Sequence, residues 1–186
     1  MKKKQWVRLT PSGVEVSGST LATSARGAAL LTELYRTYVN DYPKYFKMDE
    51  PTKLGFLATE LLLRAEGDRH EDSCDRAVIV FGRSGSIVSD RRFQASLDDD
   101  DGFFPSPSVF VYTLPNMVIG EIALRNHYHG ETAYYALDRY DPALVGSVVE
   151  ATFADGSVGS IISGWVDYAD EQHYEATMEL LTYETE

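Results

Sequence analysis

The chain has 186 residues, of which 44% are hydrophobic, so it is long enough for one domain (residues 1–186) with a sizeable core. Its formal net charge of −12 argues against nucleic-acid binding, because that binding requires a basic surface. No apolar run reaches the roughly 20 residues that cross a membrane, and no apolar signal core follows the N-terminal lysines. We therefore expect a protein without a membrane span.

The first third of the chain predicts a hairpin and two helices. Residues 7–9 and 14–16 are apolar at alternate positions and flank Pro11-Ser12-Gly13, which is typical of a hairpin turn. Leucines and tyrosines at helical spacing predict a helix from about Ala25 to Val39. A second helix is expected to begin at Asp49 or Glu50, because a proline follows in what would be its first turn.

The middle of the chain alternates strand and helix signals. The continuous apolar run Ala77–Phe81 is typical of a central strand that is covered on both faces. A Gly/Ser loop follows it, and then a short helix to Leu97. A further helix is predicted from about Pro115 to His127. The strand Thr132–Leu137 is expected to be central in a sheet, beside Ala77–Phe81.

The last third predicts helix, strand and helix. Asp141-Pro142 is a good cap and first turn for a helix to about Thr152. A strand from Val158 to Val166 and a last helix from Glu171 to Leu181 follow. The recurring order of strand, helix and strand implies βαβ units. We expect an α/β fold with a mainly parallel sheet covered by helices.

Several motifs that bind metals or phosphates in other proteins are incomplete here. His127 and His129 have no third ligand at a suitable spacing, and Asp98–Asp101 lacks the alternating ligands of a calcium loop. The loop Gly82–Ser86 follows a strand, but it lacks the Lys-Ser/Thr ending of a P-loop. We expect no metal and no cofactor.

Three segments of the second half carry a resemblance to a known family. Pro105–Ala123 combines a Pro/Ser-rich loop with Asn116 and Gly120, Gly130–Thr132 turns into a strand, and Asp155–Gly164 is a turn followed by a strand. In order and spacing they resemble landmarks in the N-terminal half of the β-ketoacyl-ACP synthases, of the thiolase-like superfamily. The resemblance implies a thiolase-like half-domain, one half of the duplicated fold of a full synthase.

The resemblance also implies that catalytic groups are missing. In its register Arg139 stands where the family has its nucleophilic cysteine, and Asp138 precedes it. A guanidinium cannot be an acyl nucleophile, so we expect a buried Arg139–Asp138 charge pair in the former cavity. The two histidines of the family belong to the other half and are expected to have no counterpart. The only cysteine, Cys74, lies in an acidic run that disfavours a thiolate, and a lone thiol fits the cytoplasm.

The function that the resemblance implies is that of an accessory subunit, similar to the chain-length factors that pair with ketosynthases in fatty-acid and polyketide pathways. The expected partner is a full-length ketosynthase or a second copy, with an acyl carrier protein as a further candidate. Tyr134 and Tyr135 are candidate interface residues, because the matching strand pairs across the synthase dimer. Asn116 is a third candidate, because the resemblance places it before a helix that packs near the dimer axis. Half of a duplicated fold should also leave apolar surface to be covered by an oligomer.

Two other functions stay open. The first is an enzyme with a reassigned nucleophile, such as a thioesterase that uses Asp138 or Ser84. The second is a stand-alone module that binds an acyl chain or an acyl carrier protein. A long apolar tunnel that reaches Arg139 would favour this module, and a tunnel blocked by Arg139 and Tyr140 would argue against it.

Overall fold

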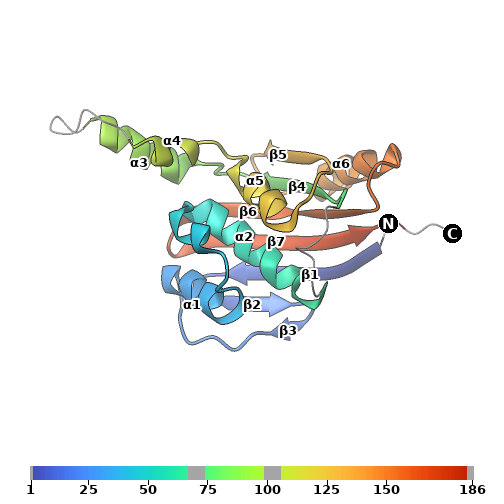
Figure 1. Ribbon diagram of the computed structural model, residues 1–186, viewed down its shortest axis with the longest axis horizontal. Coiled ribbons are helices and arrows are strands. Elements are labelled where there is room, and N and C mark those ends of the chain that lie inside the picture. Colours follow the sequence, from blue (N-terminus) through green and yellow to red (C-terminus); the bar gives the residue numbers. More distant parts are fainter. Residues whose placement is uncertain (1, 67–73, 99–105, 184–186) are drawn as a thin grey trace.

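The structure, a computed structural model, describes residues 2–66, 74–98 and 106–183 and contains one seven-stranded sheet (Figure 1). The strands lie in the order β3-β2-β1-β7-β6-β4-β5. Their bounds are β1 Lys2–Thr10, β2 Gly13–Val16, β3 Ser19–Thr20, β4 Ala77–Gly82, β5 Thr132–Ala136, β6 Ser160–Asp170 and β7 His173–Thr182. The helices are α1 Ala28–Tyr38, α2 Glu50–Leu62, α3 Ile87–Leu97, α4 Pro107–Val111, α5 Met117–Asn126 and α6 Pro142–Ala154, with 3-10 turns η1 Pro43–Lys47 and η2 Arg64–Glu66.

Local signals in the sequence set most of these elements. The amide of Thr52 donates to the side chain of Asp49 at 3.1 Å, so the predicted cap begins α2. Every residue of β4 is buried, as its unbroken apolar run predicts. The hairpin of β1 and β2 is confirmed, with Val7 opposite Val16.

The sheet is mixed, which corrects the expectation of a mainly parallel sheet. β4 pairs in parallel with β5 and β6, but the other neighbouring pairs, from β3 through to β6, are antiparallel. The α/β class and the two parallel pairings hold, because α6 carries the chain from β5 across β4 to β6. Beyond β6, the sheet consists of β7, which forms a hairpin with β6, and of the N-terminal strands β1 to β3, of which β1 pairs with β7.

The predicted last helix, Glu171–Leu181, is wrong, because this segment is strand β7. From Tyr174 to Leu180 its buried side chains alternate with partly exposed ones at a period of two, and Leu181 is buried in the cluster under α6. Glu, Ala, Met and Leu are strong helix formers, and their propensity masked the alternation. Pairing with β6 on one side and β1 on the other decides the outcome.

β5 lies beside β4, as predicted, with Tyr134 opposite Val80, but it forms the edge of the sheet and is not central. β4 is the central strand of the parallel part, since β6 occupies its other side.

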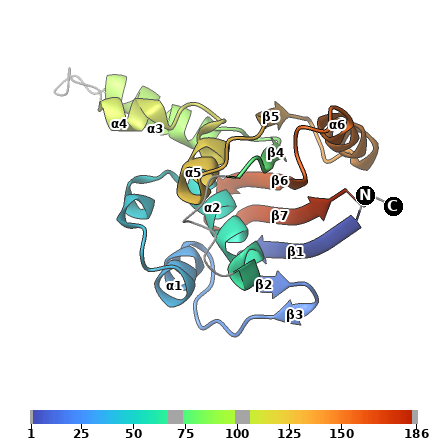
Figure 2. The ribbon, with the colours of Figure 1, turned by 45° about the vertical axis from the view of Figure 1, so that its right-hand side comes forward.

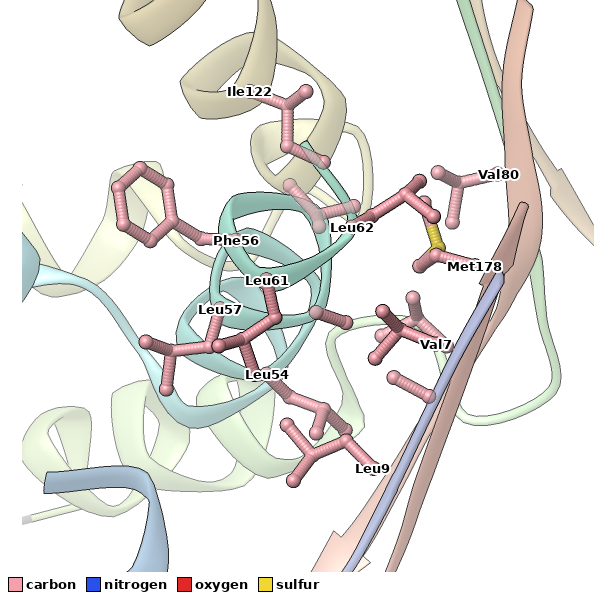
Figure 3. Close-up of a cluster of buried hydrophobic side chains, with 14 of the residues drawn as sticks. Val7, Leu9, Leu54, Phe56, Leu57, Leu61, Leu62, Val80, Ile122 and Met178 are labelled. Atoms are coloured by element: carbon pink, nitrogen blue, oxygen red, sulfur yellow. The ribbon is translucent and has the colours of Figure 1, made fainter. Parts of the chain in front are cut away.

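The helices cover the two faces of the sheet unequally. In Figure 2, α1, α2 and α5 lie on one face, while α6 lies on the other near β4 and β5. On the first face, Leu54, Leu57 and Leu61 of α2 belong to one buried cluster with Val7 and Leu9 of β1 (Figure 3). The cluster under α6 is smaller and consists of Ala77, Ile79, Phe81, Val149, Phe153, Val158, Ile161 and Leu181. In the described segments, no helix combines the length and apolarity that crossing a membrane requires.

Candidate functional site at the carboxyl ends of the parallel strands

β4, β5 and β6 run in parallel and therefore bring their carboxyl ends to one edge of the sheet, where α/β proteins commonly bind ligands. The loop Gly82–Ser86 follows β4 there, and Leu137–Asp141 follows β5. The second loop contains Arg139, the position that the sequence register equates with the family nucleophile.

The loop after β4 is closed by a carboxylate. The amide of Ser84 donates to Oδ1 of Asp167 at 2.7 Å, and Nη2 of Arg83 lies 3.2 Å from Oδ2 of the same residue. A Cβ on Gly82 would collide with the carbonyl oxygen of Val166, so glycine is required for this close approach. Because Asp167 already occupies the loop amide, the loop does not offer a phosphate cradle.

Arg139 and Asp138 are both exposed, so the expected buried charge pair is wrong. The loop leaves the edge strand at the surface, and no sheet neighbour or helix of the described chain closes over it. Tyr140 is 52% exposed, and its ring meets Trp165 edge-on at 5.8 Å. The guanidinium therefore faces solvent.

The start of α6 is not arranged to stabilise an anion. Oδ1 of Asp141 accepts hydrogen bonds from the amides of Ala143 at 3.0 Å and Leu144 at 3.2 Å. In a thiolate enzyme, free amides at a helix start lower the pKa of the nucleophile. Here a carboxylate occupies them, so this geometry favours neither a thiolate nor an oxyanion.

The two tyrosines of β5 point to opposite faces of the sheet. Tyr134 packs against the larger core cluster, and burial, followed by the nearby Asp167 carboxylate, raises its pKa to about 12. Tyr135 stacks on Phe81 with ring centroids 5.2 Å apart. Both side chains are partly exposed, and Asn116 is exposed at the start of α5 without a side-chain capping bond.

An apolar arm that the sequence analysis did not single out projects beside this edge. It consists of α3 and α4, whose Phe93 and Phe110 rings lie 5.4 Å apart (Figure 1). Five of the ten exposed large hydrophobic side chains in the described structure lie on this arm or just after it: Ile87, Leu97, Phe110, Val111 and Leu114. The sequence offered one signal for this arm: α3 has few apolar residues at helical spacing, too few to form a face that packs against the core.

The remaining candidates do not converge on a reaction centre. His127 and His129 are exposed in a turn where their backbone pairs with Cys74, itself exposed. Among the residues that the structure describes, no three His, Cys, Asp or Glu side chains form a metal-binding group. Residues 99–101 of the acidic turn lie outside the described residues.

The main cavities of the described structure do not include Arg139 in their lining. The cavity between Tyr134, Val118 and Val166, behind the edge strand, measures only about 10 Å³. A cavity of about 170 Å³ lies beside Tyr140 on the α6 face, and one of about 490 Å³ lies between the β1–β2 hairpin and the end of α2.

No model of a known protein family and no curated protein matches the sequence, whereas solved structures match the fold. An ishigamide ketosynthase/chain length factor aligns with 97% of this chain and 61% of its own, at a TM-score of 0.68 and 17% identity. A ketosynthase in complex with its chain length factor from Xenorhabdus doucetiae aligns with 98% of this chain and 79% of its own, at a TM-score of 0.62 and 14% identity.

A type II PKS acyl-carrier protein in complex with its ketosynthase bound to the hexaketide aligns with 97% of this chain and 63% of that chain, at a TM-score of 0.60 and 12% identity. The chain thus spans about 61% of the length of the first of these structures. It has the thiolase-like α/β fold of the ketosynthase and chain length factor structures, as the sequence landmarks imply.

Proposed function

We propose that this chain is a non-catalytic accessory subunit, similar to a chain-length factor, that pairs with a full-length ketosynthase in fatty-acid or polyketide-type biosynthesis. The fold supports the relationship, and the structures that it resembles include a ketosynthase in complex with its chain length factor. We place its action in the cytoplasm, which the single cysteine supports.

The residues at the nucleophile-equivalent position support a loss of catalysis. Arg139 cannot attack an acyl group, and the amides that would stabilise an anion at the start of α6 are bound by Asp141. The thioesterase alternative gains no support, because Asp138 is exposed and the hydrogen bonds of Ser84 in the described structure, to Asp167 and Ile87, include no histidine that could act as a base.

The open edge of β5 is the observation that carries the proposal. The amide of Val78 donates to the carbonyl of Glu131 at 2.8 Å, and the amide of Leu137 donates to Gly82 at 3.0 Å. Because successive residues of a strand direct their backbone groups to opposite sides, those of Thr132, Tyr134 and Ala136 point away from β4. Such an edge is a template for pairing with a strand of another chain.

The apolar arm supplies side chains for the same contact. It projects from the β4–β5 side of the sheet (Figure 1), and its exposed Leu97 and Phe110 cost free energy in water unless a partner covers them. We place Asn116, Tyr134 and Tyr135 at this interface. An acyl carrier protein is expected to dock mainly on the partner, because carrier proteins are acidic and this chain has a net charge of −12.

The test is co-expression with a full-length ketosynthase from the same host, followed by the mass of the purified complex. A stoichiometric complex is expected, and Ala136→Pro should abolish it, since proline removes an outward amide without touching the pairing to β4. Leu97→Ser on the arm should weaken it, whereas Leu124→Ser, at a leucine of α5 that is outside the arm and even more exposed, should not. Failure of the wild-type chain to bind any ketosynthase of its host would refute the proposal.

A second candidate, a module that binds an acyl chain, is favoured by the cavity of about 490 Å³. Val16, Leu21 and Leu61 form its apolar wall, and Arg64 could pair with a carboxylate. Saturable binding of a fatty acid by the chain alone, lost in Leu21→Trp, would support this function.

A further inference from the structure

Helix α6 lies at the surface, yet Glu150 is the only charged residue in it, and most of its exposed residues are small or apolar. Val149 and Phe153 face the sheet, while Ala143, Ala151 and Leu144, the last 41% exposed, face away from it. A surface helix normally carries several charged residues on its outer side. The outer side of α6 is unusually apolar for a helix that faces solvent.

The sheet face beside α6 is also uncovered. In Figure 2 no described helix lies next to α6 over β7, β1 and β2 on this side. Trp6 pairs with Glu179, which pairs with Ser163, so these side chains form one row on this face. Trp165 lies on the same face one pair further along, so both tryptophans of the chain are here, each only partly buried. Exposed aromatic rings of this kind are enriched at protein interfaces.

A groove of about 170 Å³ runs between α6 and this open strip of sheet. Pro142, Gly146 and Val149 form its helical wall, and Ser163 and Trp165 lie on its floor. The hydroxyl of Ser163 is buried, with 3% of the residue exposed, and no described atom hydrogen-bonds to it. A polar group of this kind normally has a partner, so a missing molecule is expected to supply one.

Gly146 is the second sign of a missing neighbour. It lies in the interior of α6, where glycine weakens a helix, and a Cβ built on it would meet no atom within 4 Å. The chain itself gives no reason for a glycine here. Another backbone that approaches closely would require one.

We propose that α6 of a second copy of this chain fills the groove, antiparallel to the first α6 and related to it by a two-fold axis. The exposed side of α6 carries small residues one helical turn apart, namely Ala143, Ser147, Ala151 and Ala154, and suits close packing against the Gly146 wall. A two-fold arrangement buries both apolar helices in one contact and brings a hydroxyl, that of Ser147, toward the open Ser163.

The charges along the groove fit this orientation. At its start, α6 lies near Trp165, because the ring of Tyr140 contacts that of Trp165, which is paired through Thr177 with Arg8. At its end, the ring of Phe153 contacts that of Tyr183, beyond Leu181. The helix therefore runs along the open strip from its Arg8 end to its Leu181 end. In an antiparallel pair, the exposed Arg139 of each copy lies by Asp155 of the other.

This contact goes beyond the proposed pairing with a ketosynthase and leaves β5 free for it. The test is light scattering of the purified chain alone over a range of concentrations. The mass of two chains is expected for the wild type. Gly146→Leu should give one chain, since the new side chain starts from a Cβ position that meets no described atom within 4 Å and extends toward the groove. Gly120→Leu, at a helical glycine of α5 whose Cβ position is equally open, should remain dimeric.

Charge reversal tests the orientation. Arg139→Glu should raise the dimer dissociation constant about tenfold, and Arg139→Glu combined with Asp155→Arg should return the dissociation constant to that of the wild type.

Fluorescence quenching tests which surface is covered. The two tryptophans should become less accessible to a soluble quencher as the dimer forms. A chain that is monomeric at all concentrations would overturn the proposal. A dimer that Ala136→Pro disrupts and Gly146→Leu does not would also overturn it, as would tryptophans protected only when a ketosynthase is added. None of these outcomes decides whether a ketosynthase binds at β5, which the co-expression experiment measures separately.

Discussion

Asp141 caps the helix in which Leu144 lies: Oδ1 of the carboxylate accepts a hydrogen bond from the Leu144 amide at 3.2 Å and a second from the Ala143 amide at 3.0 Å. These hydrogen bonds fix the start of α6, and they occupy the two backbone amides that would otherwise attract an anion. Removing this carboxylate is therefore expected to affect both stability and chemistry.

Asp141→Ala should lower the free energy of unfolding by about 1 kcal/mol, because the first turn of α6 loses its side-chain acceptor. Urea denaturation monitored by circular dichroism measures the change. Asp138→Ala is the matched control, since Asp138 is an exposed aspartate of the same loop that caps nothing, and its midpoint should stay near that of the wild type. Equal midpoints for the two variants would show that the cap contributes nothing.

Arg139→Cys should not restore condensation of acyl and malonyl carriers. The new thiol would sit before amides that Asp141 already binds, so its pKa should remain near the ordinary value of about 8.5. The rate of thiol alkylation against pH measures that pKa. Adding Asp141→Ala to Arg139→Cys should lower it by freeing the amides, and an already acidic thiol in the single variant would contradict this account.

Arg76 ties three separate parts of the chain together. Its guanidinium binds Glu66 through two nitrogens at 2.7 and 3.1 Å, and it also donates to Tyr128 and Ser160. Arg76→Ala should lower the free energy of unfolding by about 2 kcal/mol, because partly buried acceptors lose a charged partner. Thermal or urea unfolding measures it. Arg8→Ala, which removes a solvent-exposed pair with Glu175, should leave the midpoint almost unchanged.

Asp49 is expected to make the stability of the fold depend on pH. Burial raises the pKa of its carboxyl above the ordinary value, although hydrogen bonds from Ser89 and Thr52 act in the opposite direction. The folded state then holds the proton more tightly than the unfolded chain, so this group disfavours folding as pH rises from about 4 through its folded pKa. Below the unfolded pKa the effect is absent.

Asp49→Asn removes that titration and keeps an oxygen to cap α2. The stability of the variant relative to the wild type should therefore increase as pH rises from about 4 toward neutrality. Unfolding midpoints at a series of pH values measure the difference. A difference that is constant with pH would show that Asp49 has the same pKa in both states.

The sequence by itself determined the elements with strong local signals. The Asp-x-Pro start of α2, the Asp141-Pro142 start of α6 and the unbroken apolar run of β4 each report a requirement that is met within a few residues. The ordered landmarks between Pro105 and Gly164 also indicated the fold, which the matching structures confirm.

Only the tertiary structure decided the rest, because it depends on neighbours far away in the chain. Residues 173–182 carry good helix formers, yet β1 and β6 flank them and make them a strand. β5 is an edge strand because its only neighbour in the described sheet is β4, whose other side pairs with β6, and no local sequence pattern predicts this strand order. The same holds at the candidate site. The sequence register predicts that Arg139 replaces a nucleophile, but the exposure of Arg139 and the open groove beside α6 follow from which surfaces the described sheet leaves uncovered.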